Sequence, residues 1–415
     1  MRITQLPWLL ILATIIGLTG CFDQQAKIIQ DNSCATYDKY LGFGLALDGD
    51  YGIAGIPNGY NCYVQKTGAT YHFQRGNGDW VTNPNRSAPS FLGNNDFFGY
   101  SVAINGNYAV TGSIHEDNNA GAAYIYQRFT SIGNDNLWYQ QVRLIASDRA
   151  SGDYFGSSVA IYGDYAVVGA SNDSNAGGSS AGAVYVFKRS GSNWTQQAKL
   201  TASDGSKSDY FGIASAIDGN HLVVGASYDD TAKGSDAGSA YVFERVNNNW
   251  IERSKLGASD GGVGDLFGNA VSIHGDLVLV GAHYNDNSKG NNAGAAYLFE
   301  KSGNQWTQED KLLASDGNGG DKFGHSVAID SDYAIVGAPN NDNANGDNAG
   351  AAYVYWRVGD SLYSIEKLTS TDGAGHDYFG YRVALSGQYA ALGALYDDNS
   401  NGPDAGAVYL FEASY

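Results

Sequence analysis

The dipeptide Phe-Gly recurs seven times along the chain, and this repeat constrains the fold more than any other feature. The successive spacings are 55, 57, 56, 56, 56 and 56 residues. A long, constant period of this kind is typical of solenoids and propellers. Seven such units fill the chain after its first 20 residues and leave no room for a second domain. The dipeptides begin at Phe43, Phe98, Phe155, Phe211, Phe267, Phe323 and Phe379.

The unit that begins at Phe155 predicts four strands. Residues 155–161, 165–170, 182–187 and 194–200 are short apolar runs separated by Gly, Asn, Asp and Ser. The chain contains 56 Gly and 30 Tyr but only 6 Pro and 1 Met, which favours strands and tight turns over helices. Four antiparallel strands repeated seven times predict an all-β fold, a seven-bladed β-propeller. A stack of sandwiches is the alternative, but it would need hydrophobic caps for which the sequence gives no sign.

The two ends of the chain predict how the ring closes. Residues 25–29 (Gln-Ala-Lys-Ile-Ile) match residues 197–201 (Gln-Ala-Lys-Leu-Thr) of a fourth strand, yet they precede the first Phe-Gly. The chain stops at Tyr415, just after a third strand. We therefore expect the N-terminal strand to complete the last blade, because a ring closed in this way has no open edge. The propeller should span residues 25–415 and be monomeric.

The first 20 residues are predicted to be a targeting segment. Arg2 precedes an apolar run from Leu6 to Leu18 that is too short for a membrane span, as in a secretory signal peptide. Residues 18–21 (Leu-Thr-Gly-Cys) resemble the bacterial lipobox. An ordinary signal peptide followed by an incidental cysteine is the alternative.

The lipobox resemblance implies a site of lipid attachment. It implies that Cys21 is acylated, palmitate being one of its chains, and becomes the new amino terminus. Residues 21–24 would then form a lipidated tether between the membrane and the propeller. Phe22 follows the cysteine where an Asp could stand, which resembles lipoproteins sent to the outer membrane.

The repeat itself resembles a known family. Phe155-Gly156, then Gly169-Ala170, then Gly-Ala-Val-Tyr-Val-Phe at 182–187 resemble the FG-GAP repeat, which builds the propeller of integrin α chains and occurs in bacterial surface proteins. The resemblance implies that ligands meet the face carrying the loops between strands two and three and between blades. Integrin-type repeats often hold calcium in the turn between strands one and two. Here that turn is only a few residues, such as 162–164, so the integrin site cannot be carried over.

Aspartates concentrate in the loops expected on this one face. They occur seven and two residues before most of the Phe-Gly dipeptides and again between strands two and three. Turn and cap roles, calcium binding and acid–base catalysis are all open interpretations, since Asp serves turns and carboxylate oxygens suit calcium. The candidate calcium ligands are Asp204, Asp209, Asp229, Asp230, Asp316, Asp321, Asp342, Asp372, Asp377, Asp397 and Asp398.

Two cysteines remain after Cys21, and we expect them to pair. Cys34 precedes the first strand of blade one, and Cys62 lies between its second and third strands, so both should open onto the same face. An exported protein meets an oxidising environment, in which such thiols form a disulfide.

The sequence argues against several classes of function but does not identify a single one. With 24 Lys+Arg against 43 Asp+Glu the net charge is −19, which argues against nucleic-acid binding. No nucleophile elbow or metal-binding histidine motif accompanies the repeat. The leading hypothesis is a non-enzymatic, lipid-anchored surface module that binds a protein or a glycan through the acidic face. The alternatives are a glycan hydrolase or lyase with a site in the central depression, or a purely structural envelope protein.

Overall fold

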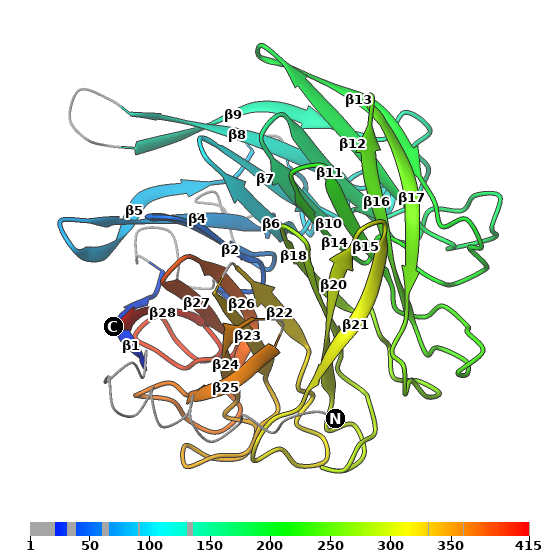
Figure 1. Cartoon of the computed structure of the whole chain (residues 1–415). Helices are drawn as coiled ribbons and strands as arrows, with labels where there is room; N and C mark the ends of the chain where they lie inside the picture. The colour runs from blue at the N-terminus through cyan, green and yellow to red at the C-terminus, as the bar shows by residue number, and fades with distance from the viewer. Residues whose placement is uncertain are drawn as a thin grey trace.

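A computed structural model describes residues 21–30, 39–59, 66–89, 92–130, 136–330, 332–359 and 361–414. Within these ranges the chain forms seven sheets of four antiparallel strands arranged in a ring (Figure 1). The one helical turn in the described ranges is α2 (Glu116–Asn119), so no helix there could cross a membrane. The seven-bladed β-propeller predicted from the repeat is confirmed.

The blades follow one another along the chain, each built from consecutive strands. Blade one contains β2 (Leu45–Asp48), β3 (Tyr51–Ile56), β4 (Ala69–Gly76) and β5 (Asp79–Ser87), and blade two contains β6 (Phe98–Asn105), β7 (Tyr108–Ser113), β8 (Ala122–Thr130) and β9 (Asn136–Leu144). Blade three contains β10 (Phe155–Tyr162), β11 (Tyr165–Ala170), β12 (Ala183–Ser190) and β13 (Asn193–Leu200), and blade four contains β14 (Ala214–Asp218), β15 (His221–Ala226), β16 (Ser239–Val246) and β17 (Asn249–Leu256). Blade five contains β18 (Ala270–His274), β19 (Leu277–Ala282), β20 (Ala295–Ser302) and β21 (Gln305–Leu312), and blade six contains β22 (Ser326–Ile329), β23 (Tyr333–Ala338), β24 (Ala351–Val358) and β25 (Ser361–Leu368). Blade seven contains β26 (Phe379–Ser386), β27 (Tyr389–Ala394), β28 (Ala407–Ser414) and β1 (Cys21–Ile28).

The first strand of each blade lies innermost, and these strands contact one another around the axis from β2 through β26 and back to β2 (Figure 1). The loops between the second and third strands and those between blades open on one end of the ring, which we call the loop face. The tight hairpins joining the first to the second strand and the third to the fourth open on the other end, the hairpin face. The axis is thus surrounded by seven short strands that all begin at the loop face.

The Phe-Gly repeat forms the contact between neighbouring blades. Phe211 is fully buried, and its ring packs edge-on against Tyr241 and Phe243 of its own blade. Its backbone forms a parallel bridge with Gly182, at the start of the third strand of the preceding blade. A Cβ on Gly182 would lie 2.1 Å from the carbonyl oxygen of Phe211. The small residue is therefore required because two backbones approach each other there.

Blade one differs from the sequence prediction in the residues that occupy its Phe-Gly position. Leu41 is fully buried and forms the parallel bridge with Gly406 that Phe residues form in the other blades. Gly42 has φ +92°, like the glycines of the other Phe-Gly pairs. Leu41-Gly42 therefore occupies the Phe-Gly position, and the prediction of Phe43 for that place is wrong. The ring of Phe43 instead lies 5.0 Å from that of Tyr100.

Closure by the N-terminal strand is confirmed. β1 pairs antiparallel with β28, with Cys21 opposite Ser414 and Ile28 opposite Val408. The strand begins at Cys21, so residues 21–24, expected to be a tether, lie in the sheet. The reason is Phe22, which is 3% exposed and packs edge-on against Tyr333.

Phe22 fills the position that tryptophan occupies in other blades. It lies five residues before Lys27, as Trp194 lies five residues before Lys199. The ring of Trp194 packs edge-on against Tyr108 of the preceding blade. The aromatic contact between neighbouring blades is thus repeated where the two ends of the chain meet.

Candidate functional site

The aspartates of the loop face are held by lysine and tyrosine. In blade four, the Tyr241 hydroxyl donates to Asp204 at 2.8 Å, and the Lys255 ammonium lies 2.6 Å from Asp204 and 2.7 Å from Asp229. Asp229 is buried and accepts a further hydrogen bond from Ser239. Burial acts to raise the pKa of Asp204, but the bonds from Lys255 and Tyr241 outweigh it and lower that pKa. We call this arrangement the aspartate–lysine cluster.

The cluster recurs around the ring. In blade three, Lys199 lies between Asp148 and Asp173 at 2.6 and 2.8 Å. In blades five and six, Lys311 and Lys367 hold Asp260 and Asp316, each at 2.6 Å. In blade seven the lysine comes from the other end of the chain: Lys27 of β1 lies 2.8 Å from Asp372 and 2.9 Å from Asp397. The Tyr409 hydroxyl lies within hydrogen-bond distance of both carboxylates, at 2.8 and 2.7 Å.

A second set of aspartates caps the loops between blades. The carboxylate of Asp209 accepts the backbone N–H of Ser206, three residues earlier, at 2.6 Å. Burial raises the pKa of Asp209 to about 6, and repulsion from Asp229 contributes. Burial likewise raises the pKa of Asp377 to about 6. The same bond is made by Asp96, Asp153, Asp209, Asp265, Asp321 and Asp377. These residues therefore have the turn and cap role that was one of the open interpretations.

A third set organises the loop between the second and third strands. Asp230 accepts the backbone N–H of Asp236, six residues on, at 2.9 Å. Asp342 and Asp398 make the equivalent bond at 2.8 Å. These contacts stay within one loop and join its two ends.

The predicted calcium ligands are thus all engaged with protein donors. In three blades an ammonium already lies between the two loop carboxylates, where a calcium ion would need to be. Among the described residues no group of three or more His, Cys, Asp or Glu could hold a metal ion. Calcium binding therefore stays a prediction that this geometry does not favour. The other predicted pair, Cys34 and Cys62, lies outside the described residues, and Cys21 is an exposed free thiol.

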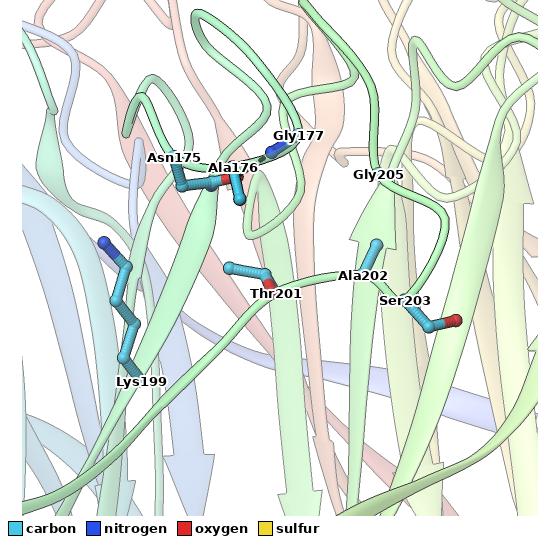
Figure 2. A pocket seen from close by; sticks show the side chains of 8 residues that line it. All are labelled: Asn175, Ala176, Gly177, Lys199, Thr201, Ala202, Ser203 and Gly205. Atoms are coloured by element: carbon cyan, nitrogen blue, oxygen red, sulfur yellow. Dashed lines mark hydrogen bonds between the residues drawn. The ribbon is translucent and has the colours of Figure 1, made fainter.

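Crevices separate the two kinds of loop. In blade three a cavity of about 560 Å³ lies between the loop carrying Asn175 and Gly177 and the segment from Lys199 to Gly205 (Figure 2). A second crevice of about 340 Å³ occupies the same place in blade four, where Lys233 stands in the position of Gly177. The Lys199 ammonium on the wall in Figure 2 is already bound to two carboxylates. The lysine of the cluster therefore offers no free charge to a ligand in these crevices.

Aromatic side chains gather on the loop face at the start of the inner strands. The residue preceding each Phe-Gly position has a positive φ, and five of these seven residues are Tyr or Phe: Tyr40, Phe97, Tyr154, Tyr210 and Tyr378. Bulky residues in this conformation are uncommon, and such strain tends to cluster at functional sites.

These rings pair with aromatic side chains of the loop after the second strand. Tyr210 lies 5.1 Å from Tyr228, and Tyr378 lies 5.2 Å from Tyr396. Tyr396 also contacts Tyr40, which extends the contact from blade seven to blade one. We call the combined set the aromatic rim: Tyr40, Phe97, His115, Tyr154, Tyr210, Tyr228, Tyr284, Tyr378 and Tyr396.

The aspartates could be identified from the sequence, but their partners were missed. The signal was present: tyrosine recurs 37 residues, and lysine 51 residues, after the aspartates at 148, 204, 260 and 316. The aromatic rim was also missed, because its residues differ from blade to blade and only those that precede the Phe-Gly position share a positive φ.

Substituting the cluster lysine should destabilise the fold without creating a metal requirement. We expect Lys255→Met to cost about 2 kcal/mol, between the values for exposed and buried ion pairs, because Asp229 is left buried. Urea unfolding measures the loss. Lys233→Met in the same blade is the control. Among the residues that the structure describes, the Lys233 ammonium bonds only the carbonyl of Ser259, so its loss should change stability by less than about 0.5 kcal/mol.

The same clusters predict how the unmodified protein responds to ions. Its melting temperature should be equal in calcium, magnesium and EDTA at matched ionic strength, because each candidate carboxylate has a protein donor. A calcium-specific rise that disappears in Asp229→Ala/Asp230→Ala would instead establish a calcium site.

Comparison with known proteins identifies the family of the repeat. The model of the FG-GAP repeat family matches residues 92–126, 138–187, 194–243, 250–299, 306–355 and 364–411, which is more than half of the chain. No match falls on blade one, in which Leu41-Gly42 replaces Phe-Gly. A search of curated proteins gives no match. From the family match and the seven blades together, this chain belongs to the FG-GAP repeat family, in an integrin-like propeller.

Proposed function

We propose that this protein is a non-enzymatic binding module that recognises a protein or glycan ligand with its loop face. The observation that carries the proposal is the aromatic rim, in which five Tyr or Phe residues with positive φ contact further Tyr and His side chains around the axis. Tyr is enriched in interfaces because its ring gives a large contact area and its hydroxyl a hydrogen bond. Tyr228 of the rim is 41% exposed.

Binding fits this face better than catalysis does. The paired carboxylates that could serve as acid and base are held by Lys255 and its equivalents, or by backbone N–H groups. A carboxylate committed to an ammonium and a tyrosine hydroxyl has a lowered pKa, as Asp204 has, and is a poor general acid at neutral pH.

We also propose that the module is attached to the outer membrane through a lipid on Cys21. Cys21 is exposed and lies at the hairpin-face end of the outer strand of blade seven. A lipid there would leave the loop face free for a ligand. Membrane attachment, cleavage after Gly20 and the identity of the ligand are parts of this proposal.

The test combines a binding screen with a matched pair of tyrosine variants. Protein beginning at residue 21 with Cys21→Ser is applied to a glycan array and to a pull-down from envelope extract. We expect Tyr228→Ser to weaken binding at least tenfold. Tyr162→Ser should leave it unchanged, because Tyr162 is equally exposed, at 40%, but lies on the hairpin face. Equal effects of the two variants would contradict the loop-face proposal.

The lipid part of the proposal is checked separately, with the full chain expressed in cells. The full chain should partition with membranes at the mature size, and its Cys21→Ser variant should be released or remain unprocessed. A Cys21→Ser protein that stays membrane-bound at the mature size would contradict lipid attachment.

A further inference from the structure

A channel along the axis breaks the seven-fold repeat at one residue. Its cavity of about 200 Å³ is lined by the first strands of all seven blades. The residue three positions after the start of each Phe-Gly, or of Leu41-Gly42 in blade one, lines this cavity. In six blades it is small: Gly44, Ser101, Ser158, Ala214, Ala270 and Ser326. In blade seven it is Arg382.

Arg382 is held in place but not neutralised. Its Nε donates to the carbonyl oxygen of Phe43 at 3.1 Å, and its guanidinium lies 5.9 Å from the ring of Phe43 and 5.3 Å from that of Tyr381. Within the described part of the chain no carboxylate forms an ion pair with it, and the described residues lining the cavity include no Asp or Glu. The terminal amino groups therefore remain available to a ligand. A planar guanidinium with this geometry favours a carboxylate.

The surroundings of Arg382 divide into an aromatic and a hydroxylated sector. Phe43 lies between Tyr100 and Tyr381, at ring distances of 5.0 and 5.7 Å. Farther round the ring, the Ser158 hydroxyl donates to the carbonyl of Gly212 at 2.8 Å and accepts from the Ser215 hydroxyl at 2.9 Å, which leaves the Ser215 oxygen able to accept a hydrogen bond. Aromatic rings offer apolar faces to a ligand, and serine oxygens offer partners to hydroxyl groups.

Two neighbouring histidines do not add charge to the site. The rings of His283 and His325 lie 5.5 Å apart. Burial, and then the nearby Arg382, lowers the pKa of His325 well below its usual value. Burial lowers the pKa of His283 to about 4. Both imidazoles are therefore neutral at pH 7, and Arg382 supplies the positive charge of this sector.

We propose that the channel mouth is a binding site for a sugar acid, with the carboxylate on Arg382, one face of the ring on Tyr381, Phe43 and Tyr100, and hydroxyl groups toward the serines. The cavity is smaller than the ~300–1,000 Å³ typical of drug-sized ligands, so it accommodates a single ring. The inference rests on the proposed function, because it makes the bound glycan of the loop face an acidic one. The net charge of −19 favours a ligand with one carboxylate over a densely charged polymer.

In the experiment, the protein beginning at residue 21 is titrated separately with glucuronate, glucose and acetate. NMR or calorimetry measures each affinity. We expect glucuronate to bind at least tenfold more tightly than either of the others. Arg382→Gln should lose at least tenfold in glucuronate affinity, and Arg382→Lys should recover part of it. Lys322→Gln is the control, since Lys322 lies over Tyr284 on the same face but does not line the cavity. Melting temperatures of all variants establish that they fold.

Three outcomes would overturn the inference. Acetate binding as tightly as glucuronate would mean that no sugar ring is recognised. An acidic peptide that binds in an Arg382-dependent way while glucuronate does not would make the partner a protein. Equal losses in Arg382→Gln and Lys322→Gln would mean non-specific attraction. In each case the Tyr228 comparison decides separately whether the loop face binds a ligand, so the two proposals can fail independently.

Discussion

Without residues 25–29 the protein should aggregate or unfold at a much lower temperature. The deletion removes most of β1 and leaves the backbone groups of β28 unpaired at an exposed edge, which favours association. It also removes Lys27 and leaves Asp397, whose side chain is 1% exposed, without its ammonium. Loss of the equivalent ammonium in blade four is expected to cost about 2 kcal/mol, and here the lost strand adds to it. That is a large part of the stability of a typical protein.

Thermal unfolding and size-exclusion chromatography measure this effect. Removal of residues 1–20 alone is the control and should leave a stable monomer. A synthetic peptide of residues 21–30 added to the deleted protein should restore part of the melting temperature, since it can pair with β28. A deletion mutant that is monomeric and equally stable would contradict closure by the N-terminal strand.

Gly182→Ala should be nearly as damaging, although it adds one methyl group. The new Cβ would lie 2.1 Å from the carbonyl oxygen and 2.5 Å from the nitrogen of Phe211 in the next blade. Both atoms belong to a backbone, so the two blades must separate. We expect a loss of more than about 3 kcal/mol in the free energy of unfolding, as for other strained or overpacked core sites.

Gly191→Ala provides the matched control for this substitution. Gly191 also has a positive φ, +63°, but a Cβ added to it in the hairpin turn would meet nothing within 4 Å. It should cost only about 1–2 kcal/mol, the conformational term alone. Urea unfolding of both variants isolates the contact between blades. Equal losses would mean that backbone conformation, not the approach of Phe211, requires the glycine.

The architecture could be predicted because it follows from the period of the sequence repeat. The positions that depart from the repeat are determined by side-chain packing. The 56-residue spacing was sufficient for the number of blades, and the match of residues 25–29 to residues 197–201 was sufficient for closure. The spacing could not distinguish Leu41-Gly42 from the Phe-Gly dipeptide two residues later, because both are a large apolar residue followed by glycine. The correspondence of Phe22 with Trp194 was present in the alignment of residues 25–29 with 197–201, but it was missed because the two residues differ in type.

The site was predicted less well, for a geometric reason. The aspartates were identified from their repetition, but whether a carboxylate binds calcium or a lysine depends on the strand that lies across from it. Arg382 was missed because β26 has an irregular register between Phe379 and Arg382, so simple alternation does not tell which side chains face the axis. Deviations from a repeat become informative only after the inward positions are known.

The position of Cys21 has a mechanical consequence. Cys21 lies at the hairpin-face end of β1, and the ligand is proposed to bind at the opposite end of the molecule. A pull on a lipid at Cys21 would then reach the propeller through β1. Seven residue pairs join β1 to β28, and Phe22 joins it to blade six through Tyr333, so these contacts would carry the load. The strand that closes the ring would thus also be the strand that bears the pull.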